Sequence, residues 1–150
     1  MTLASPPVIV LWCVAALLIA AGLAIAIARS PAGTRIVYGA SLAASLIALA
    51  AALLYLLDAH AAAPPTVALP LGLPWLGAHF RMDALAAFFL VVVNLGGAAA
   101  SFYGIGYGTH ESAPHRVLPF YQAFLAGMNL VVLADDAFTF LLSWEFMSLS

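Results

Sequence analysis

Long apolar runs, unbroken by charge, limit the folds open to this chain more than any other feature of its sequence. Hydrophobic residues make up 66% of the 150 residues and charged residues only 7%, with a mean hydropathy of +1.13. A soluble domain carries roughly 25% charged residues, which it needs to cover its surface. The composition therefore predicts a protein whose helices lie in lipid.

Four of these runs are long enough to cross a hydrocarbon layer about 30 Å thick. They cover residues 8–28, 36–57, 84–107 and 117–134. A fifth run, 137–150, gives only about 21 Å of helix. The predicted fold class is an all-α membrane protein, a polytopic transmembrane helix bundle with four complete spans plus a truncated fifth. We expect residues 1–150 to be the N-terminal portion of a single membrane domain that continues further; a re-entrant or interfacial segment is the alternative for the last run.

The flanks of the first run favour an anchor helix over a secretory signal peptide. Ala26-Ile-Ala28 resembles a cleavage site, but no basic segment precedes the run and the run is longer than a signal peptide needs. Arg29, Arg35 and Arg116 lie in the first and third gaps between runs, against Arg81 alone in the second. Because cytoplasmic loops are enriched in basic residues, this distribution predicts an external N-terminus and an external second gap.

The second gap, residues 58–83, is the one extended stretch between the predicted spans. Its prolines are Pro64, Pro65, Pro70 and Pro74. Proline at this density excludes a helix, and Thr66–Leu69 with Trp75–Phe80 is predicted to form a small hairpin. Asp83 is predicted to be the N-cap of the helix that follows. No salt bridge is expected between Arg81 and Asp83, which would not meet on a helix.

Small residues recur every fourth position in the first two predicted helices. The alanines are Ala16, Ala20, Ala24, Ala28, Ala40, Ala44, Ala48 and Ala52. Such stripes let helix backbones approach closely in lipid, so they predict packing faces. Gly96, Gly97 and Ser101 form a similar patch on the third helix.

Several function classes are excluded by composition. The chain has four Arg and no Lys, so it lacks the basic surface that binding to nucleic acid requires. Cys13 is the single cysteine, which rules out an intrachain disulfide and a cysteine metal cluster. We therefore predict no cofactor, no metal and no nucleic-acid partner, and the lipid bilayer is the predicted environment of the helices.

Glu145 is the strongest functional candidate because it interrupts an apolar run. Nine helical steps from Asp136 place it roughly 13 Å into the layer. A charged side chain at that depth costs at least about 2.5 to 3.5 kcal/mol, so the carboxyl must be neutral, paired or hydrated. Each of these states suits proton transfer, and Ser143 and Ser148 are expected to support it, the latter from one turn away on the same face.

Other polar residues inside the predicted spans favour a structural interpretation. Asn94, Gln122 and Asn129 are predicted to make interhelical hydrogen bonds worth about 0.6 to 2 kcal/mol, with Asn129 retained as a possible support for Glu145. Asp135 and Asp136 mark a tight turn between helices, where Asp136 is predicted to be an N-cap. Asp136 is also predicted to support proton translocation.

Four segments together resemble a known family. They are Phe80–Phe89, Ala100–Tyr103, Val132–Phe138 and Leu142–Ser150. They are similar to the N-terminal part of the antiporter-like membrane subunits of respiratory complex I, of Mrp-type cation/proton antiporters and of membrane-bound hydrogenase and formate hydrogenlyase complexes. The resemblance covers about the first five of the family's roughly fourteen helices. Within the family, the sequence around Trp144-Glu145 is more similar to that of the hydrogenase-type branch.

The resemblance implies a role for Glu145 in proton translocation. It matches the family's fifth-helix glutamate, which modulates the proton affinity of a lysine on a later helix; this chain contains no lysine. The family often has Asn where this chain has Asp136. By resemblance we expect a non-catalytic subunit of a redox complex in the bacterial inner membrane, with other membrane subunits as partners.

Two other functions stay open from sequence. A structural or assembly protein without transport activity would use Glu145 as an ordinary contact between helices. A membrane-embedded hydrolase is weaker, because the chain has no His-Glu-x-x-His motif, no Gly-x-Ser-x-Gly motif and no paired aspartates within a span.

Overall fold

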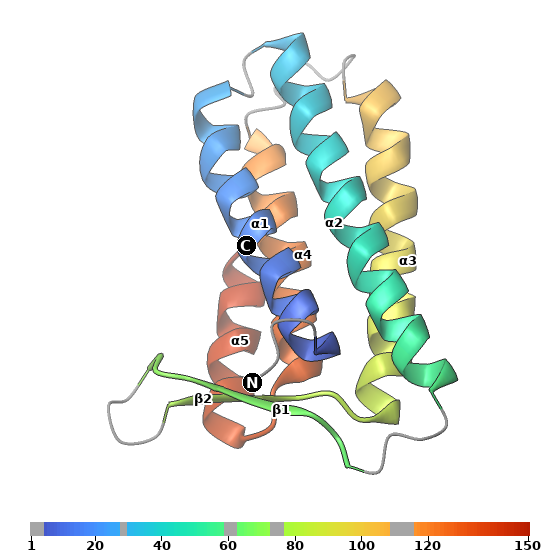
Figure 1. The fold of residues 1–150 in the computed structure, drawn as a ribbon. Helices are drawn as coiled ribbons and strands as arrows, with labels where there is room; N and C mark the ends of the chain where they lie inside the picture. The colour runs from blue at the N-terminus through green and yellow to red at the C-terminus, as the bar shows by residue number, and fades with distance from the viewer. Residues whose placement is uncertain (1–4, 28–29, 59–62, 73–76, 109–115) are drawn as a thin grey trace.

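The computed structural model describes residues 5–27, 30–58, 63–72, 77–108 and 116–150. Within these ranges, helices run side by side along one axis and a two-stranded hairpin crosses one end of them (Figure 1). In chain order the elements are α1 (Pro6–Ile27), α2 (Pro31–Leu57), β1 (Thr66–Leu69), β2 (Ala78–Arg81), α3 (Ala84–Tyr107), α4 (Leu118–Leu133) and α5 (Ala137–Leu149).

The prediction of a bundle of apolar helices of membrane-spanning length is confirmed in part. Three of the described helices, α1, α2 and α3, are long and apolar enough to cross a membrane. The two that follow are apolar but shorter, with 16 residues in α4 and 13 in α5, or about 24 Å and 20 Å of helix. The fourth complete span is therefore not confirmed and stays a prediction, because Ala134 already has extended backbone that leads into the turn.

Capping residues decide where the helices begin. Ser30 has extended backbone and its side chain accepts the N–H of Gly33 at 2.9 Å, with Pro31 at the first helical position. For this reason α2 begins earlier than its apolar run predicts. The prediction for Asp83 is confirmed, since its carboxylate accepts the N–H of Ala86 at 2.8 Å.

The helices pack so that α2 lies against both α1 and α3, while α4 lies against α1 and α5 (Figure 1). The predicted packing stripes are confirmed in part: the buried members are Ala20, Ala24, Ala44, Ala48 and Ala52. Ala16 and Ala40 are exposed, and Ala28 lies outside the described residues. On α3, Gly97 and Ser101 are buried whereas Gly96 faces open space, so two members of that patch form an interface.

The predicted hairpin is confirmed. β1 and β2 pair antiparallel with Val67 opposite Phe80, and both of these side chains are buried against the helix ends. β2 begins at Ala78 rather than at position 75, and residues 75–76 lie outside the described part. Gly72 and Gly77 have φ angles of +86° and +69°, which glycine adopts without strain. The hairpin thus covers the end of the bundle formed by α1, α4 and α5 (Figure 1).

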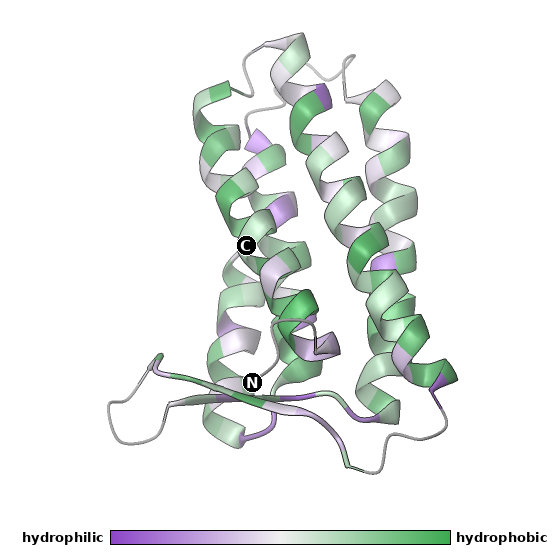
Figure 2. Ribbon diagram, in the orientation of Figure 1, coloured by the Kyte–Doolittle hydropathy of each residue, from purple (hydrophilic) through white to green (hydrophobic). Residues whose placement is uncertain are grey.

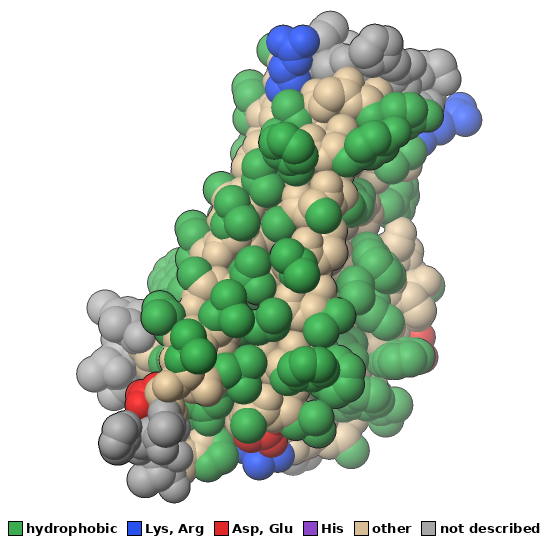
Figure 3. Space-filling model, turned by 90° about the vertical axis from the view of Figure 1, so that its right-hand side faces the viewer, with side chains coloured by type: hydrophobic (Ala, Val, Ile, Leu, Met, Phe, Trp, Pro, Cys, Tyr) green, Lys and Arg blue, Asp and Glu red, His purple; other side chains and the backbone are tan. Residues whose placement is uncertain are grey.

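Polar residues are concentrated at the ends of the molecule. Figure 2 shows helices that are mostly apolar along their length, with hydrophilic residues in the hairpin and at isolated interior positions. On the face drawn in Figure 3, arginine side chains lie at both ends and hydrophobic side chains cover most of the surface between them. This distribution is the one expected of helices that stand across a lipid layer.

Candidate functional site

Glu145 lies on the outward side of α5. The inward side of this helix carries Thr139 and Ser143, which are buried against its neighbours. Glu145 is exposed, and its neighbours one turn away on the same surface are also exposed: Leu141, Leu142, Ser148 and Leu149. The carboxylate therefore lies on an exposed face of α5 whose nearest positions carry three leucines and one serine.

The depth predicted for Glu145 depends on the length of helix that precedes it. α5 is continuous from Ala137, so eight steps place Glu145 about 12 Å along the helix. α4 and α5 run antiparallel in close contact, since a Cβ on Gly127 would lie 2.8 Å from the Cβ of Met147. Glu145 consequently stands at about the level of Asn129 on α4, well inside the apolar part of the bundle.

None of the described side chains pairs with the Glu145 carboxylate. The described arginines lie at helix or strand ends, at positions 35, 81 and 116. The expected support from Ser148 takes another form, because the Ser148 hydroxyl donates to the backbone carbonyl oxygen of Glu145 at 3.0 Å. A serine hydroxyl in a helix reaches a backbone carbonyl oxygen one turn earlier more readily than it reaches a neighbouring carboxylate that points away from the helix.

Ser143 has a different environment from the one proposed for it. It is buried, at 6% exposure, and with Thr139 it supplies the hydroxyl side chains of an otherwise apolar groove of about 400 Å³. The groove runs between α1, α4, α5 and the hairpin, and Phe80 and Phe146 are among its lining residues. Ser143 and Glu145 thus face opposite sides of α5, and the structure does not bring them together.

The predicted interhelical hydrogen bond of Asn129 is confirmed. Its Oδ1 accepts from Asn94 Nδ2 at 2.7 Å, which joins α3 to α4. Each amide nitrogen also donates to the carbonyl oxygen one turn earlier, from Asn94 to Leu90 at 2.9 Å and from Asn129 to Leu125 at 2.8 Å. Asn129 is therefore engaged with α3, and the structure does not place it in contact with Glu145.

Gln122 and a pair of hydroxyl groups make further buried hydrogen bonds, nearer the end of the bundle opposite the hairpin. The Ser41 hydroxyl donates to Gln122 Oε1, which joins α2 to α4. Ser101 on α3 and the Tyr121 hydroxyl on α4 share a hydrogen bond of 2.8 Å. Ser41 and Tyr121 are not among the residues predicted from sequence; the serine spacing of four residues, from 41 to 45, is the signal that marks one polar helix face.

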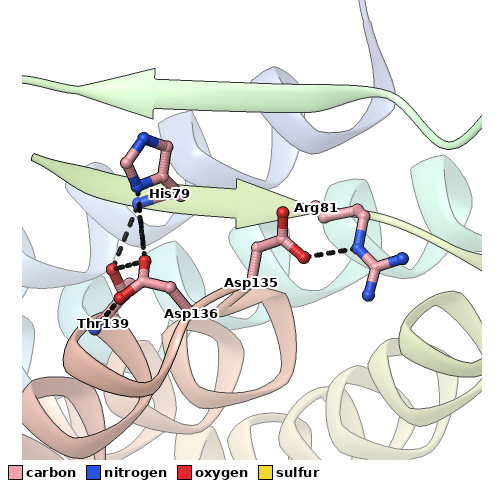
Figure 4. A network of polar contacts seen from close by, with 5 residues as sticks. All are labelled: His79, Arg81, Asp135, Asp136 and Thr139. Carbon is pink, nitrogen blue, oxygen red and sulfur yellow. Dashed lines mark hydrogen bonds and ion pairs between the residues drawn. The ribbon is translucent and has the colours of Figure 1, made fainter.

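Asp136 is the centre of a polar network that joins the hairpin to α5 (Figure 4). Its N-cap prediction is confirmed, with Oδ1 accepting the Thr139 N–H at 2.9 Å and Oδ2 accepting the Thr139 hydroxyl at 2.5 Å. The His79 N–H donates to Thr139 Oγ1 at 3.1 Å, and His79 Nδ1 lies 3.4 Å from Asp136 Oδ2. The hydroxyl and backbone N–H of Thr139 lower the pKa of Asp136, against burial, which raises it.

Arg81 corrects an expectation from the sequence. Its Nη1 lies 3.6 Å from Asp83 Oδ2, although no such pair is predicted for residues two apart on a helix. Arg81 ends a strand, and the extended backbone there lets both side chains reach the same side. A shorter contact of 2.6 Å joins Arg81 Nε to Asp135 Oδ1, so the hairpin is also tied to the turn before α5 (Figure 4).

The described residues contain no group of three or more His, Cys, Asp or Glu side chains placed to hold a metal ion. They do contain a carboxylate on the exposed surface of an apolar helix, a group of buried neutral polar side chains between helices, and an ionic network at the hairpin. These features define a bundle of apolar helices, three of them long enough to cross a membrane, with one isolated carboxyl group along the apolar length of its described helices.

Known proteins are similar to this chain over part of its length. No protein-family model matches the chain. The chain is 35% identical over 78 residues to Uncharacterized protein MT0090 of Mycobacterium tuberculosis strain CDC 1551 / Oshkosh, and equally to Uncharacterized protein Rv0083 of Mycobacterium tuberculosis strain ATCC 25618 / H37Rv. Each match covers 52% of this chain but only 12% of the relative, so the chain spans a small part of the relatives' length.

Proposed function

We propose that this chain forms the N-terminal part of an antiporter-like subunit that moves protons or cations across a bacterial inner membrane, within a redox-driven complex of the hydrogenase or formate hydrogenlyase type. The observation that supports the proposal is the position of Glu145, a carboxyl group about 12 Å along an apolar helix. Its exposed face carries leucines and no described basic group. In this proposal α4 completes a fourth span and the hairpin lies on the external side.

The position of Glu145 calls for a partner. Leaving its charge in lipid costs at least about 2.5 to 3.5 kcal/mol, and the described part of the chain offers no cation to offset that cost. A basic side chain on a helix packed against α5 would favour the carboxylate when close, and the carboxylate would favour the charged base. Separating the pair releases a proton from the base, which is the elementary step of translocation.

The test is Glu145→Gln in inverted membrane vesicles from cells that carry the change in the gene for the full protein. NADH, formate and hydrogen are supplied in turn as electron donors, and acidification of the vesicle lumen is followed by quenching of a fluorescent amine. We expect loss of most of the acidification that the complex supports, with the protein still present at normal levels. The matched control is Asp58→Asn, the same chemical change at the end of α2, which should leave acidification unchanged.

A structural or assembly role is the second candidate, favoured by the interhelical bonds of Asn129 and Gln122. The same experiment distinguishes the two functions. Normal acidification in vesicles that contain normal amounts of the Glu145→Gln protein would contradict the transport role. A complex that fails to assemble in this variant, but assembles with Asp58→Asn, would support the structural role.

A further inference from the structure

Three buried polar atoms at the meeting point of α2, α3 and α4 have no hydrogen-bond partner among the described residues. They are Ser45 Oγ, Asn94 Oδ1 and Gln122 Nε2, and all three residues are fully buried. Buried polar atoms are almost always hydrogen-bonded, and one left unpaired costs about 1 to 3 kcal/mol. Three such atoms within one interface require a shared explanation.

Gly97 marks the middle of the region that holds these three side chains. A Cβ on this glycine would lie 3.1 Å from Ser45 Oγ and 2.8 Å from Leu125 Cδ1, so α2 and α4 both press against α3 at this point. Asn94 lies three residues before Gly97 on α3, and Gln122 lies three residues before Leu125 on α4. Because α3 and α4 run antiparallel, with Asn94 beside Asn129 and Ser101 beside Tyr121, Asn94 and Gln122 lie about one helical turn from Gly97 on opposite sides of it, and Ser45 lies between them.

The atom types suit a small ligand that both donates and accepts hydrogen bonds. Asn94 Oδ1 is an acceptor; its identity follows from Nδ2, which donates to Leu90 O and to Asn129 Oδ1. Gln122 has one amide atom bonded to the Ser41 hydroxyl, so the other atom stays unpaired in either orientation of the amide. Ser45 Oγ can donate or accept. Nothing in this set is charged, which argues against an ion.

We propose that two internal water molecules lie inside the bundle, one bound between Ser45 and Asn94 and the other between Ser45 and Gln122. Internal waters typically make two to four hydrogen bonds to polar groups that are otherwise unsatisfied, and each of these two positions lies between two such groups. Such water joins the Ser41–Gln122 pair to the Asn94–Asn129 pair, and so forms a continuous hydrogen-bonded path along the bundle interior. These waters would be present whether or not Glu145 translocates protons, because the Glu145 side chain lies on the exposed, outward side of α5.

Side-chain amide spectroscopy tests the site directly. Gln122, Asn94 and Asn129 are the only side-chain amides in the whole sequence, so a ¹⁵N-labelled chain in phospholipid nanodiscs gives three resolved NH₂ groups. We expect the Gln122 NH₂ protons to show a cross-peak to water whose sign in rotating-frame and laboratory-frame experiments indicates bound water and not chemical exchange. Absence of this cross-peak in the folded wild-type chain would overturn the proposal, whatever any variant does.

Two serine variants then assign the site. Ser45→Ala removes one of the three ligands, and we expect loss of the Gln122 cross-peak. Ser143→Ala is the matched control, because it removes another buried hydroxyl, from a different interface, and should leave the cross-peak in place. A cross-peak that persists in Ser45→Ala would come from magnetisation relayed through the Ser41 hydroxyl and would contradict the site. Loss in both variants would also contradict it, since it would report a general disturbance.

Discussion

Single polar side chains in this protein are placed by hydrogen bonds that cross between helices. Asn94 and Asn129 each satisfy one donor on their own helix and then meet across the α3–α4 interface. In lipid, such a bond contributes on average about 0.6 kcal/mol and at most about 1.7, because the separated helices find other partners. The pair therefore specifies which faces of α3 and α4 meet more than it adds to the total stability.

The first prediction at this scale concerns that pair. In a double-mutant cycle of Asn94→Ala and Asn129→Ala, we expect a coupling energy of about 0.6 to 1.7 kcal/mol, since both changes remove the same bond. The free energy of unfolding is measured by SDS titration in mixed micelles. The control cycle combines Asn94→Ala with Asp136→Asn, which share no contact and should be additive within about 0.5 kcal/mol. Strict additivity of the asparagine pair would contradict the contact.

The second prediction concerns the carboxyl group of Asp136. Its pKa is lowered in the folded protein, chiefly by the Thr139 hydroxyl, from an ordinary value of 3.8. A lowered folded pKa means that its stabilising effect is fully present above the ordinary value and is lost as the pH falls through the lowered one. The stability difference between wild type and Asp136→Asn should therefore shrink as the pH falls below 3.8.

The measurement is SDS-induced unfolding of both proteins at several pH values from about 5 to about 2.5. Neighbouring charged groups, His79, Arg81 and Asp135, are present in both proteins, so their direct contributions largely cancel in the difference. Asp58→Asn, which lies at another helix end, serves as the control. A wild-type advantage over Asp136→Asn that stays constant across this pH range would contradict the assigned network.

At the scale of whole elements, the sequence predicts the existence of helices better than their contacts. Apolar runs locate α1 to α5, the prolines and β-prone runs locate the hairpin, and Asp83 and Asp136 are recognisable as caps. The side of α5 that faces inward is not predictable, because apolar residues surround this helix on all sides. Its orientation follows from contacts distant in sequence, such as His79 with Thr139.

The same limit applies to the candidate site. The unusual position of Glu145 follows from its type and its apolar neighbours, whereas the engagement of Asn129 with Asn94 and of Ser148 with a backbone carbonyl depends on three-dimensional packing. Arg81 illustrates the reason. Its pairing with Asp135 joins residues 54 positions apart, and no local periodicity contains that information.

The prediction at the element scale concerns the close approach of α4 and α5. Alanine at Gly127 would place a Cβ 2.8 Å from Met147 Cβ and 2.9 Å from its Cα, so the helices must separate. Forcing atoms into a packed interface costs about 1 to 3 kcal/mol, and we expect that loss in the free energy of unfolding of Gly127→Ala.

Gly96→Ala is the matched control, because a Cβ there meets nothing within 4 Å. Alanine is favoured over glycine within a helix by up to about 1 kcal/mol, so this variant should be as stable as the wild type or more so. SDS titration of both variants in mixed micelles measures the difference. Equal stabilities for the two alanine variants would show that α4 and α5 are not in the contact described.

For the molecule as a whole, the two ends of the bundle differ in chemistry. The end that carries the hairpin holds Arg81, which is paired with Asp135 and Asp83. Arg35 and Arg116 belong to the opposite end, near the starts of α2 and α4. Basic residues accumulate on the cytoplasmic side of membrane proteins, so this asymmetry predicts that the hairpin end is external.

Cysteine labelling in intact cells tests this orientation. In a Cys13→Ala background, which removes the one cysteine of these 150 residues, one cysteine is introduced either at the exposed Leu71, shortly after β1, or at the exposed Ala32, near the start of α2. We expect a membrane-impermeant maleimide to label Leu71→Cys in intact cells and Ala32→Cys only after permeabilisation. The two positions are matched by exposure and differ in the end of the bundle on which they lie. The reverse labelling pattern would show that the protein has the opposite orientation in the membrane, with the Asp136 network on the cytoplasmic side.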